Sequence, residues 1–449
     1  MTAIDPVRLL SQVEHRIKTR SAIVGVIGMG YVGLPLARIF ARKGFQVRGF
    51  DIDPDKVEKL NAGQSYIHHI PGQSIAELVA TGHFEATTDF AALGACDAVL
   101  ICVPTPLTRQ RQPDLSYVVA TTEAILPHLR AGHLVVLEST TYPGTTDEIM
   151  RPILERSGLV SGQDFFLGFS PEREDPGNTS FETATIPKIV GGQGQAALRL
   201  ACLLYDQVVP RTIPVSSCAT AEAVKLTENI FRSVNIALVN ELKVVYERMG
   251  IDVWEVIEAA KSKPFGFMPF YPGPGLGGHC IPIDPFYLTW KAREYDLSTR
   301  FIELAGEINT AMPGHVVDRL ALALDQHFRK SLNGARILVL GMAYKKNVDD
   351  IRESPAIRII HMLETRGAVT SYHDPLVPEI HRTREHPELA GRRSVALSPE
   401  TLAGFDAAVI VTDHDAVDYA ALVRHSKLVV DTRNATRAVR AEGAVVVKA

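Results

Sequence analysis

A glycine-rich loop that contains one cysteine is the part of this sequence that suggests chemistry most directly. In the run Gly273–Pro285, four glycines precede Cys280, and Asp284 follows it by four residues. Glycine lets the backbone approach another group closely, and a thiol beside a cavity lined by backbone can act as a nucleophile. If a helical turn begins near the cysteine, Asp284 shares its face. A buried cysteine in a tight glycine turn explains the spacing equally well.

Three further polar residues stand where they could assist such chemistry. Lys225 and Asn229 are spaced i, i+4 on a predicted helix, so together they could hold an oxyanion; an ordinary polar helix face is the more frequent reason for such a pair. Glu172 follows a predicted strand, where parallel sheets carry catalytic carboxylates. It could also be a loop carboxylate paired with Arg173.

The elements that must position these residues follow an α/β pattern. Short apolar runs alternate with helical stretches in both the first and the last part of the chain, which predicts parallel sheets built from βαβ units. The expected strands are Ala22–Ile27, Gln46–Phe50, Ala98–Val103, Leu134–Leu137, Phe165–Gly168, Arg336–Leu340, Ala368–Tyr372, Ala407–Val411 and Lys427–Val430.

Between these parts the pattern is mostly helical, and one helix is predicted over Ala221–Gly250 without a proline. We therefore expect two Rossmann-like, doubly wound parallel-sheet domains, at residues 1–215 and 321–449, joined by a central helical domain at 216–320 with a long spine helix. Such a helix is also a plausible dimer face.

The first predicted strand leads into the glycine pattern of a dinucleotide site. Gly28, Gly30 and Gly33 have the GxGxxG spacing, with a strand before them and a helix, Leu34–Lys43, after them. They would permit a tight turn, backbone approach to a pyrophosphate and close helix–strand packing, respectively. Asp51 ends the next strand and could bind both ribose hydroxyls, which favours NAD over NADP. The alternative is a glycine turn in a domain that binds no nucleotide.

The corresponding turn of the last domain, Gly341–Lys346, lacks this glycine pattern. Its Lys345 and Lys346, with Arg352, suit phosphate recognition without a second dinucleotide; a solvated basic turn is the alternative.

Composition narrows the class of protein. The 449 residues are 46% hydrophobic and 22% charged, with a net charge of −4, which predicts a soluble globular protein that binds neither nucleic acid nor membranes. Five scattered cysteines make no disulfide framework. With no signal-peptide pattern, the expected location is the cytoplasm. We expect no metal.

Taken together, these motifs resemble the UDP-glucose/UDP-N-acetylhexosamine/GDP-mannose dehydrogenase family from about Ile23 to Arg433. The matching stretches are Gly28–Gly33, Val103–Pro106, Glu138–Thr140, Ser170–Gly177, Ala221–Asn229, Gly277–Asp284 and Leu340–Ser354.

The resemblance implies a role for each candidate residue. Cys280 would be the nucleophile, Lys225 and Asn229 the oxyanion stabilisers, Asp284 a base acting through water or on Lys225, and Glu172 the group that handles the hydrolytic water. The expected NAD-binding residues are Gly28, Gly30, Tyr31, Val32, Gly33, Asp51, Lys56, Thr105, Thr140 and Arg352. Those expected to bind the nucleotide sugar are Arg173, Lys225, Asn229, Phe270, Tyr271, Gly275, Gly277 and Lys345.

The implied reaction oxidises a sugar CH2OH to a carboxylate in two hydride transfers to NAD, through a thioester on Cys280. His279 and the run Pro171–Gly177 resemble the N-acetylhexosamine branch, so UDP-N-acetylglucosamine is the first expected substrate. UDP-N-acetylmannosamine is the second, and Arg173 is expected near the 2-acetamido group. UDP-N-acetylgalactosamine and UDP-glucose stay open. The product would serve surface polysaccharide synthesis, and the partner would be a second copy, as a homodimer or dimer of dimers.

Two readings of other classes remain. A two-electron dehydrogenase of the hydroxyacid type would use Lys225 and Asn229 without a thiol and release one NADH per substrate. A non-catalytic NAD sensor would release none.

Overall fold

The computed structural model describes residues 5–67, 70–108, 110–173, 185–278, 281–381, 386–440 and 443–449. The chain forms two compact units. Unit 1 comprises residues 1–228 and 286–297, and unit 2 comprises 229–285 and 298–449. Among the described residues, no helix combines the length and the apolar character needed to cross a membrane.

Unit 1 is built around an eight-stranded sheet with the order β3-β2-β1-β4-β5-β6-β7-β8. Its strands are β1 (Ile23–Ile27), β2 (Gln46–Phe50), β3 (Phe84–Thr87), β4 (Ala98–Ile101), β5 (Leu134–Leu137), β6 (Phe166–Phe169), β7 (Lys188–Gly192) and β8 (Thr212–Pro214). Its helices are α1 (Pro6–Lys18), α2 (Gly33–Arg42), α3 (Pro54–Asn61), α4 (Gly72–Ala80), α5 (Ser116–Ile125), α6 (Arg151–Glu155) and α7 (Gly194–Tyr205).

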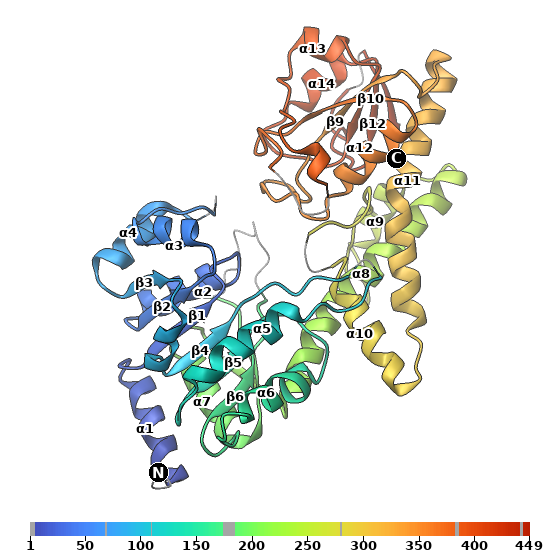
Figure 1. Cartoon of the computed structure of the whole chain (residues 1–449). Coiled ribbons are helices and arrows are strands. Elements are labelled where there is room, and N and C mark those ends of the chain that lie inside the picture. Colours follow the sequence, from blue (N-terminus) through green and yellow to red (C-terminus); the bar gives the residue numbers. More distant parts are fainter. Residues whose placement is uncertain are drawn as a thin grey trace. The chain divides into compact units, whose positions relative to one another are not determined.

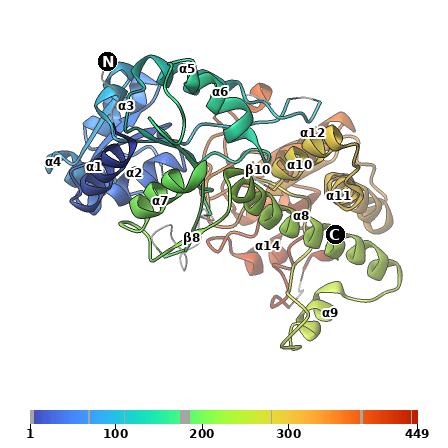
Figure 2. The ribbon, with the colours of Figure 1, turned by 90° about the horizontal axis from the view of Figure 1, so that it is seen from below.

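Both faces of this sheet are covered, which explains why its strands are apolar at nearly every position. Alternate strand residues point to opposite faces. Val24 and Val26 join a core with α1, α2, α4 and α7, whereas Val99 and Ile101 join a second core with α5 and α6. Figures 1 and 2 show α2 and α7 on one side of the sheet and α5 and α6 on the other. The predicted Rossmann-like architecture is confirmed.

One strand departs from the predicted parallel order. β7 pairs antiparallel with β6, while β8 pairs parallel with β7. A parallel neighbour requires a crossover connection, usually a helix, and the sequence between β6 and β7 carries Pro171, Pro176 and Pro187. Prolines interrupt helices, so this connection is poorly suited to a crossover helix.

The predicted spine helix is present as α8 (Cys218–Arg248), an uninterrupted helix of 31 residues. Gly250 follows its end with φ +72°, as expected of a glycine beyond a helix C-terminus. The border between the two units falls within this helix, after Glu228. α10 (Asp284–Ala292) begins in unit 2, and its residues from Phe286 onward belong to unit 1.

Unit 2 contains a five-stranded parallel sheet with the order β10-β9-β11-β12-β13. Its strands are β9 (Arg336–Leu340), β10 (Val369–His373), β11 (Ala407–Ile410), β12 (Leu428–Asp431) and β13 (Val445–Lys448). Its helices are α9 (Val253–Ala260), α11 (Arg300–Phe328), α12 (Pro355–Thr365), α13 (Pro399–Ala403) and α14 (Tyr419–His425). α11 and α12 pack on one face of the sheet, and α13 and α14 pack on the other.

Candidate active site

The turn after β1 has a shape suited to a dinucleotide pyrophosphate. Gly28 has φ +92°, and its N–H donates to the Phe50 carbonyl at 2.7 Å. A Cβ on Gly33 would lie 1.9 Å from the Gly28 oxygen, whereas a Cβ on Gly30 would meet no atom within 4 Å. Gly33 is therefore needed by the fold itself. Gly30 leaves open space in front of the turn, where a phosphate could approach the backbone.

Asp51 is held at the end of β2 beside this turn. Its carboxylate is nearly buried and accepts hydrogen bonds from the Met29 and Asp53 N–H groups, each at 3.0 Å. The Lys56 ammonium lies 3.5 Å from its Oδ2. The remaining acceptor sites of the carboxylate can serve ribose hydroxyls, so these residues fit NAD.

The other predicted cofactor residues of unit 1 surround the same edge of the sheet. Tyr31 and Val32 are half-buried at the start of α2, and Thr140 is half-buried beyond β5. Thr105 is buried beyond β4, and its carbonyl accepts a hydrogen bond from the Tyr287 hydroxyl at 2.8 Å. Tyr287 of α10 is thus tied to the sheet edge that carries the predicted NAD-binding residue Thr105.

Glu172 and Arg173 follow β6 and are held in different ways. The Glu172 side chain is 13% exposed, and the Lys188 ammonium lies 3.5 Å from its Oε2. Arg173 forms an ion pair with Glu228 at 2.6 Å and donates to the Pro187 carbonyl at 2.7 Å. The Glu172 carboxylate is therefore paired with Lys188, and the Arg173 guanidinium is paired with Glu228. The alternative that Glu172 forms an ion pair with Arg173 is not what the structure shows. The peptide N–H of Arg173 does donate to Glu172, at 2.7 Å.

On α8, Lys225 and Asn229 lie one helical turn apart and are both buried. Asn229 donates from Nδ2 to Oδ2 of Asp284 at 2.5 Å. Asp284 is the first residue of α10 and is 2% exposed. A carboxylate so far removed from water is stable only with hydrogen-bond donors around it. Asn229 supplies one donor and is itself fixed in orientation by the bond.

The predicted nucleophile, Cys280, and its neighbour His279 lie outside the described residues. The loop that leads to them packs closely against other residues of unit 2. Gly278 donates to the Arg352 carbonyl at 3.0 Å, and Cβ atoms on Gly277 and Gly278 would lie 2.5 and 2.8 Å from Tyr344. Gly275 has φ +134° and faces Pro313. These three glycines thus fit the loop against the protein itself.

The four cysteines other than Cys280 are poor nucleophiles. Cys96 and Cys218 are buried, while Cys102 and Cys202 are half-buried. Burial raises the pKa of each of these thiols above its ordinary value. Because the thiolate is the reactive form, none of these four thiols is suited to nucleophilic attack.

In the second sheet, the turn after β9 repeats part of the first turn. Gly341 has φ +86° and donates to the His373 carbonyl at 2.8 Å. Asp374, the counterpart of Asp51 in position, accepts from Met342 and Ala343 at 2.7 and 2.9 Å, and from His414 at 3.1 Å. With further bonds from the Leu376 and Val377 N–H groups, this carboxylate is fully engaged and has little capacity left for a ribose.

The predicted basic residues of this turn are only partly available. Lys345 is half-buried. Lys346 forms an ion pair with Asp415 at 2.5 Å, and Arg352 forms one with Asp350 at 2.6 Å. Arg352 belongs to unit 2, whereas the glycine turn that suits NAD belongs to unit 1.

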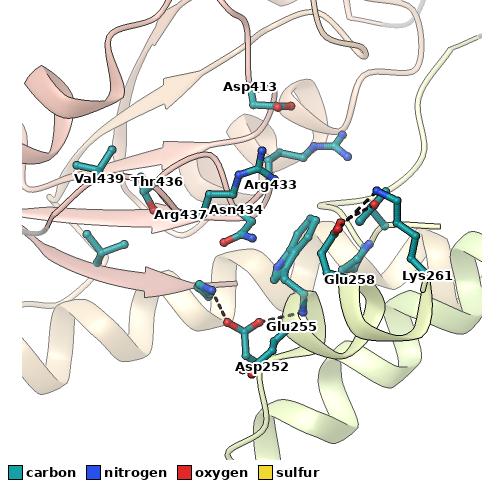
Figure 3. Close-up of a pocket in the computed structure, with 15 residues that line it drawn as sticks. Asp252, Glu255, Glu258, Lys261, Asp413, Arg433, Asn434, Thr436, Arg437 and Val439 are labelled. Atoms are coloured by element: carbon teal, nitrogen blue, oxygen red, sulfur yellow. Dashed lines mark hydrogen bonds and ion pairs between the residues drawn. The ribbon is translucent and has the colours of Figure 1, made fainter. Parts of the chain in front are cut away.

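A pocket of about 850 Å³ in unit 2 brings in residues that sequence reasoning missed. Its walls come from α9, from Tyr271 and Pro272, from the 433–439 turn and from β13, and Figure 3 shows Arg433 between Asp413 and Asn434. The rings of Trp254 and Tyr271 stack at 5.8 Å. Phe270 is half-buried beside Phe231, with ring centroids 5.7 Å apart.

Arg433 is one of the cations that line this pocket, and its Nε donates to the Val411 carbonyl at 2.9 Å. It follows the carboxyl end of β12, which is where ligands bind in open α/β sheets. That position after the strand Lys427–Val430 was the available signal in the sequence.

Comparison with protein families divides the chain into three matched parts. Residues 22–209 match the NAD binding domain of the UDP-glucose/GDP-mannose dehydrogenase family. Residues 219–311 match the central domain of that family, and residues 338–438 match its UDP binding domain.

Individual relatives cover between 79% and 95% of the chain. A UDP-N-acetyl-D-glucosamine 6-dehydrogenase of Pseudomonas aeruginosa is 38% identical over 79% of this chain and 83% of the relative. An NDP-N-acetyl-D-galactosaminuronic acid dehydrogenase of Ralstonia solanacearum is 35% identical over 94% of this chain and 97% of the relative. The solved structure of a UDP-D-ManNAc dehydrogenase from Pyrococcus horikoshii superimposes with a TM-score of 0.84 at 33% identity, covering 95% of this chain and 98% of that one.

The glycine turn and Asp51 fit NAD, and the family's NAD-binding and UDP-binding domains account for the two sheets. The chain therefore belongs to the UDP-glucose/GDP-mannose dehydrogenase family, as an NAD-dependent UDP-sugar dehydrogenase.

Proposed function

We propose that this enzyme oxidises C6 of UDP-N-acetyl-D-glucosamine from the alcohol to the carboxylate, with two NAD consumed for each sugar. The observation that carries the four-electron reaction is the buried Asn229–Asp284 bond directly after the glycine–cysteine loop. An amide held in place by a carboxylate at this position can support a step in which negative charge develops on the oxygen of a carbon that is bound to sulfur. A two-electron dehydrogenase needs no thiol here.

The Gly28–Gly33 turn and Asp51 would hold NAD, which would supply the acceptor for the hydride from the sugar carbon. Cys280 adds to the C6 aldehyde and later carries the acyl group as a thioester. Lys225 and Asn229 stabilise the oxyanion; one such donor in a site shielded from water is typically worth about 3–4 kcal/mol. Asp284 orients Asn229 and acts as a base through water, and Glu172 takes a proton from the water that hydrolyses the thioester.

The nucleotide part of the substrate is assigned to unit 2. Arg433, Tyr271 and Lys345 suit this role, because a guanidinium binds phosphate oxygens in pairs and an aromatic ring can stack on a base. Replacement of Arg433 by alanine should raise KM for the nucleotide sugar with little change in KM for NAD. Equal effects on both constants would argue against this assignment.

The choice of sugar is supported by the P. aeruginosa relative, which is a UDP-N-acetyl-D-glucosamine 6-dehydrogenase. Other relatives act, by their names, on N-acetylgalactosaminuronic acid or N-acetylmannosamine nucleotides. We place Arg173 near the 2-acetamido group. Arg173→Ala should therefore lower kcat/KM for UDP-N-acetylglucosamine more than for UDP-glucose, while Glu228→Gln, which removes only the ion partner, should preserve the ratio.

The decisive experiment measures NADH release and product mass across UDP-N-acetylglucosamine, UDP-N-acetylmannosamine, UDP-N-acetylgalactosamine and UDP-glucose. Two NADH and a uronate from the first sugar support the proposal. One NADH with an aldehyde product would instead support a two-electron dehydrogenase. Cys280→Ser should abolish the carboxylate, and its undiminished formation would exclude the thioester.

A further inference from the structure

Beneath Glu172, unit 1 buries a lysine between two carboxylates. Lys188 is the first residue of β7, and its side chain is 4% exposed. Its Nζ lies 2.7 Å from Oε2 of Glu138 and 3.5 Å from Oε2 of Glu172, and it donates to the Pro171 carbonyl at 3.3 Å. A buried ammonium is costly unless it is paired. Here its three oxygen partners come from two loops at one edge of the sheet.

The far side of this arrangement is closed. Glu138 is fully buried beyond β5, and its Oε1 accepts a hydrogen bond from the Tyr205 hydroxyl at the end of α7. The Tyr205 ring centre lies 5.1 Å from the Lys188 Nζ. Glu138 and Tyr205 therefore fix the ammonium from behind, and Glu172 is the more exposed of its two carboxylate partners.

We propose that Lys188 is the positioning residue of Glu172: anchored by Glu138, it presents a fixed positive charge that keeps Glu172 ionised and oriented toward the hydrolytic water. This inference rests on the role proposed for Glu172. In that step the water oxygen bonds to the acyl carbon, the C–S bond breaks, and the sulfur leaves as thiolate. Glu172 takes one water proton, and the other stays with the acid product.

The charges around Glu172 predict in which direction its pKa changes when a neighbouring charge is removed. Among the described residues, the groups near Glu172 include Lys188, Glu138, Tyr205 and Cys102, together with Arg173, which donates its N–H to Oε1 of Glu172 at 2.7 Å. Two carboxylates share one ammonium. Removal of the Lys188 ammonium should thus raise the pKa of Glu172. Neutralising Glu138 should have the opposite effect and lower the pKa of Glu172, because the ammonium would then interact with Glu172 alone.

The experiment uses the full-length enzyme with NAD and the nucleotide sugar that yields most NADH. In Lys188→Met, the pH profile of turnover should shift upward by about one unit or more. Thioester hydrolysis should slow at least tenfold, so that two NADH per site appear in a burst and the acyl group is found on Cys280 by mass spectrometry. Lys188→Arg should restore part of the rate. Glu138→Gln should shift the profile downward.

A matched control is available in the same unit. Lys291 is also buried between two carboxylates, Glu148 at 2.6 Å and Glu294 at 2.7 Å, but it does not contact Glu172. Lys291→Met should lower stability without a burst or a shifted profile. Opposite shifts in Lys188→Met and Glu138→Gln cannot come from a general loss of stability.

The outcomes also separate this inference from the proposed function. If Glu172→Gln accumulates thioester but Lys188→Met and Glu138→Gln keep the wild-type profile, the role of Lys188 is wrong and that of Glu172 stands. If Glu172→Gln hydrolyses the thioester normally, both are wrong. Glu138→Gln keeps the size of the side chain and one acceptor oxygen for the Lys188 ammonium, so it tests the charge argument even where Lys188→Met does not fold.

Discussion

At the scale of single residues, carboxylates of this protein differ by the donors around them. Asp51 has acceptor sites left open beside a glycine turn. The acceptor sites of Asp374 are occupied by hydrogen bonds from backbone N–H groups and from His414. The same residue type at the same place in two similar sheets thus serves a ligand in one and the fold in the other. A sequence motif alone does not reveal how many lone pairs are already occupied.

Asp51 should govern the choice between NAD and NADP. Asp51→Ser removes the acceptor of the ribose hydroxyls and the charge that repels a 2′-phosphate, and it leaves Lys56 nearby. Hydrogen bonds to a charged group contribute about 1.5–3 kcal/mol, so kcat/KM for NAD should fall about 10- to 100-fold while that for NADP rises. Asp53→Ser is the control, because the Asp53 side chain caps α3 and the backbone N–H that Asp53 donates to Asp51 is kept in the variant. An unchanged NAD/NADP ratio in Asp51→Ser would refute this role.

Glu222 should make stability depend on pH. It is fully buried and accepts from Gly144 and Thr146, but burial dominates and raises its pKa to about 7. Between about pH 4.5 and 7 the folded state then holds a proton that the unfolded state has lost, so stability falls as pH rises, by on the order of 3 kcal/mol.

Denaturant unfolding of the wild type and of Glu222→Gln at pH 5.0 and 7.5 measures this contribution. The stability advantage of the wild type over the variant should be larger at pH 5.0. A difference that is the same at both pH values would mean that Glu222 is ionised in the folded protein throughout.

At the scale of elements, two glycines of the turn between β1 and α2 serve different purposes: Gly33 is needed for the fold, and Gly30 leaves space for a ligand. A Cβ on Gly33 collides with the Gly28 carbonyl, but a Cβ on Gly30 enters open space. Gly33→Ala should therefore destabilise the folded protein, by about 1–3 kcal/mol as for other overpacked sites, and weaken NAD binding with it.

Gly30→Ala should instead retain the wild-type Tm and lose NAD affinity by tenfold or more, because its methyl group occupies the space of the pyrophosphate. Thermal unfolding and NAD titration of the two variants test the distinction. A lowered Tm in Gly30→Ala would show that this glycine, too, is needed for the fold.

At the scale of the whole molecule, α8 carries an apolar stripe that its own unit leaves half-exposed. Phe231, Leu238 and Val245 are 48%, 51% and 46% exposed and recur every seven residues, hence on one face of the helix. We propose that this stripe pairs with a second copy of the chain, as a homodimer or a dimer of dimers, since exposed stripes of this kind mark interaction sites.

The double variant Leu238→Glu/Val245→Glu should then convert the assembly to monomers, as measured by light scattering after size exclusion. Leu322→Glu on α11, where the leucine is 42% exposed, should not. A wild type that is already monomeric at micromolar concentration would rule out the pairing.

The sequence alone was sufficient to predict the two sheets, the spine helix and the NAD turn. Each depends on local rules: apolar strand runs, helical spacing without proline, and glycines at fixed offsets between a strand and a helix. Asp51 was predictable for the same reason, because its place at a strand end follows from the pattern.

Only the tertiary structure decided which partners these residues meet. The antiparallel β7 brings Lys188 under Glu172, and the buried bond from Asn229 to Asp284 joins residues far apart in sequence. The structure also revealed that Gly277 and Gly278 lie too close to Tyr344 to carry a Cβ atom. Spacing along a chain constrains neighbours within an element, but contacts between elements depend on how the whole core packs.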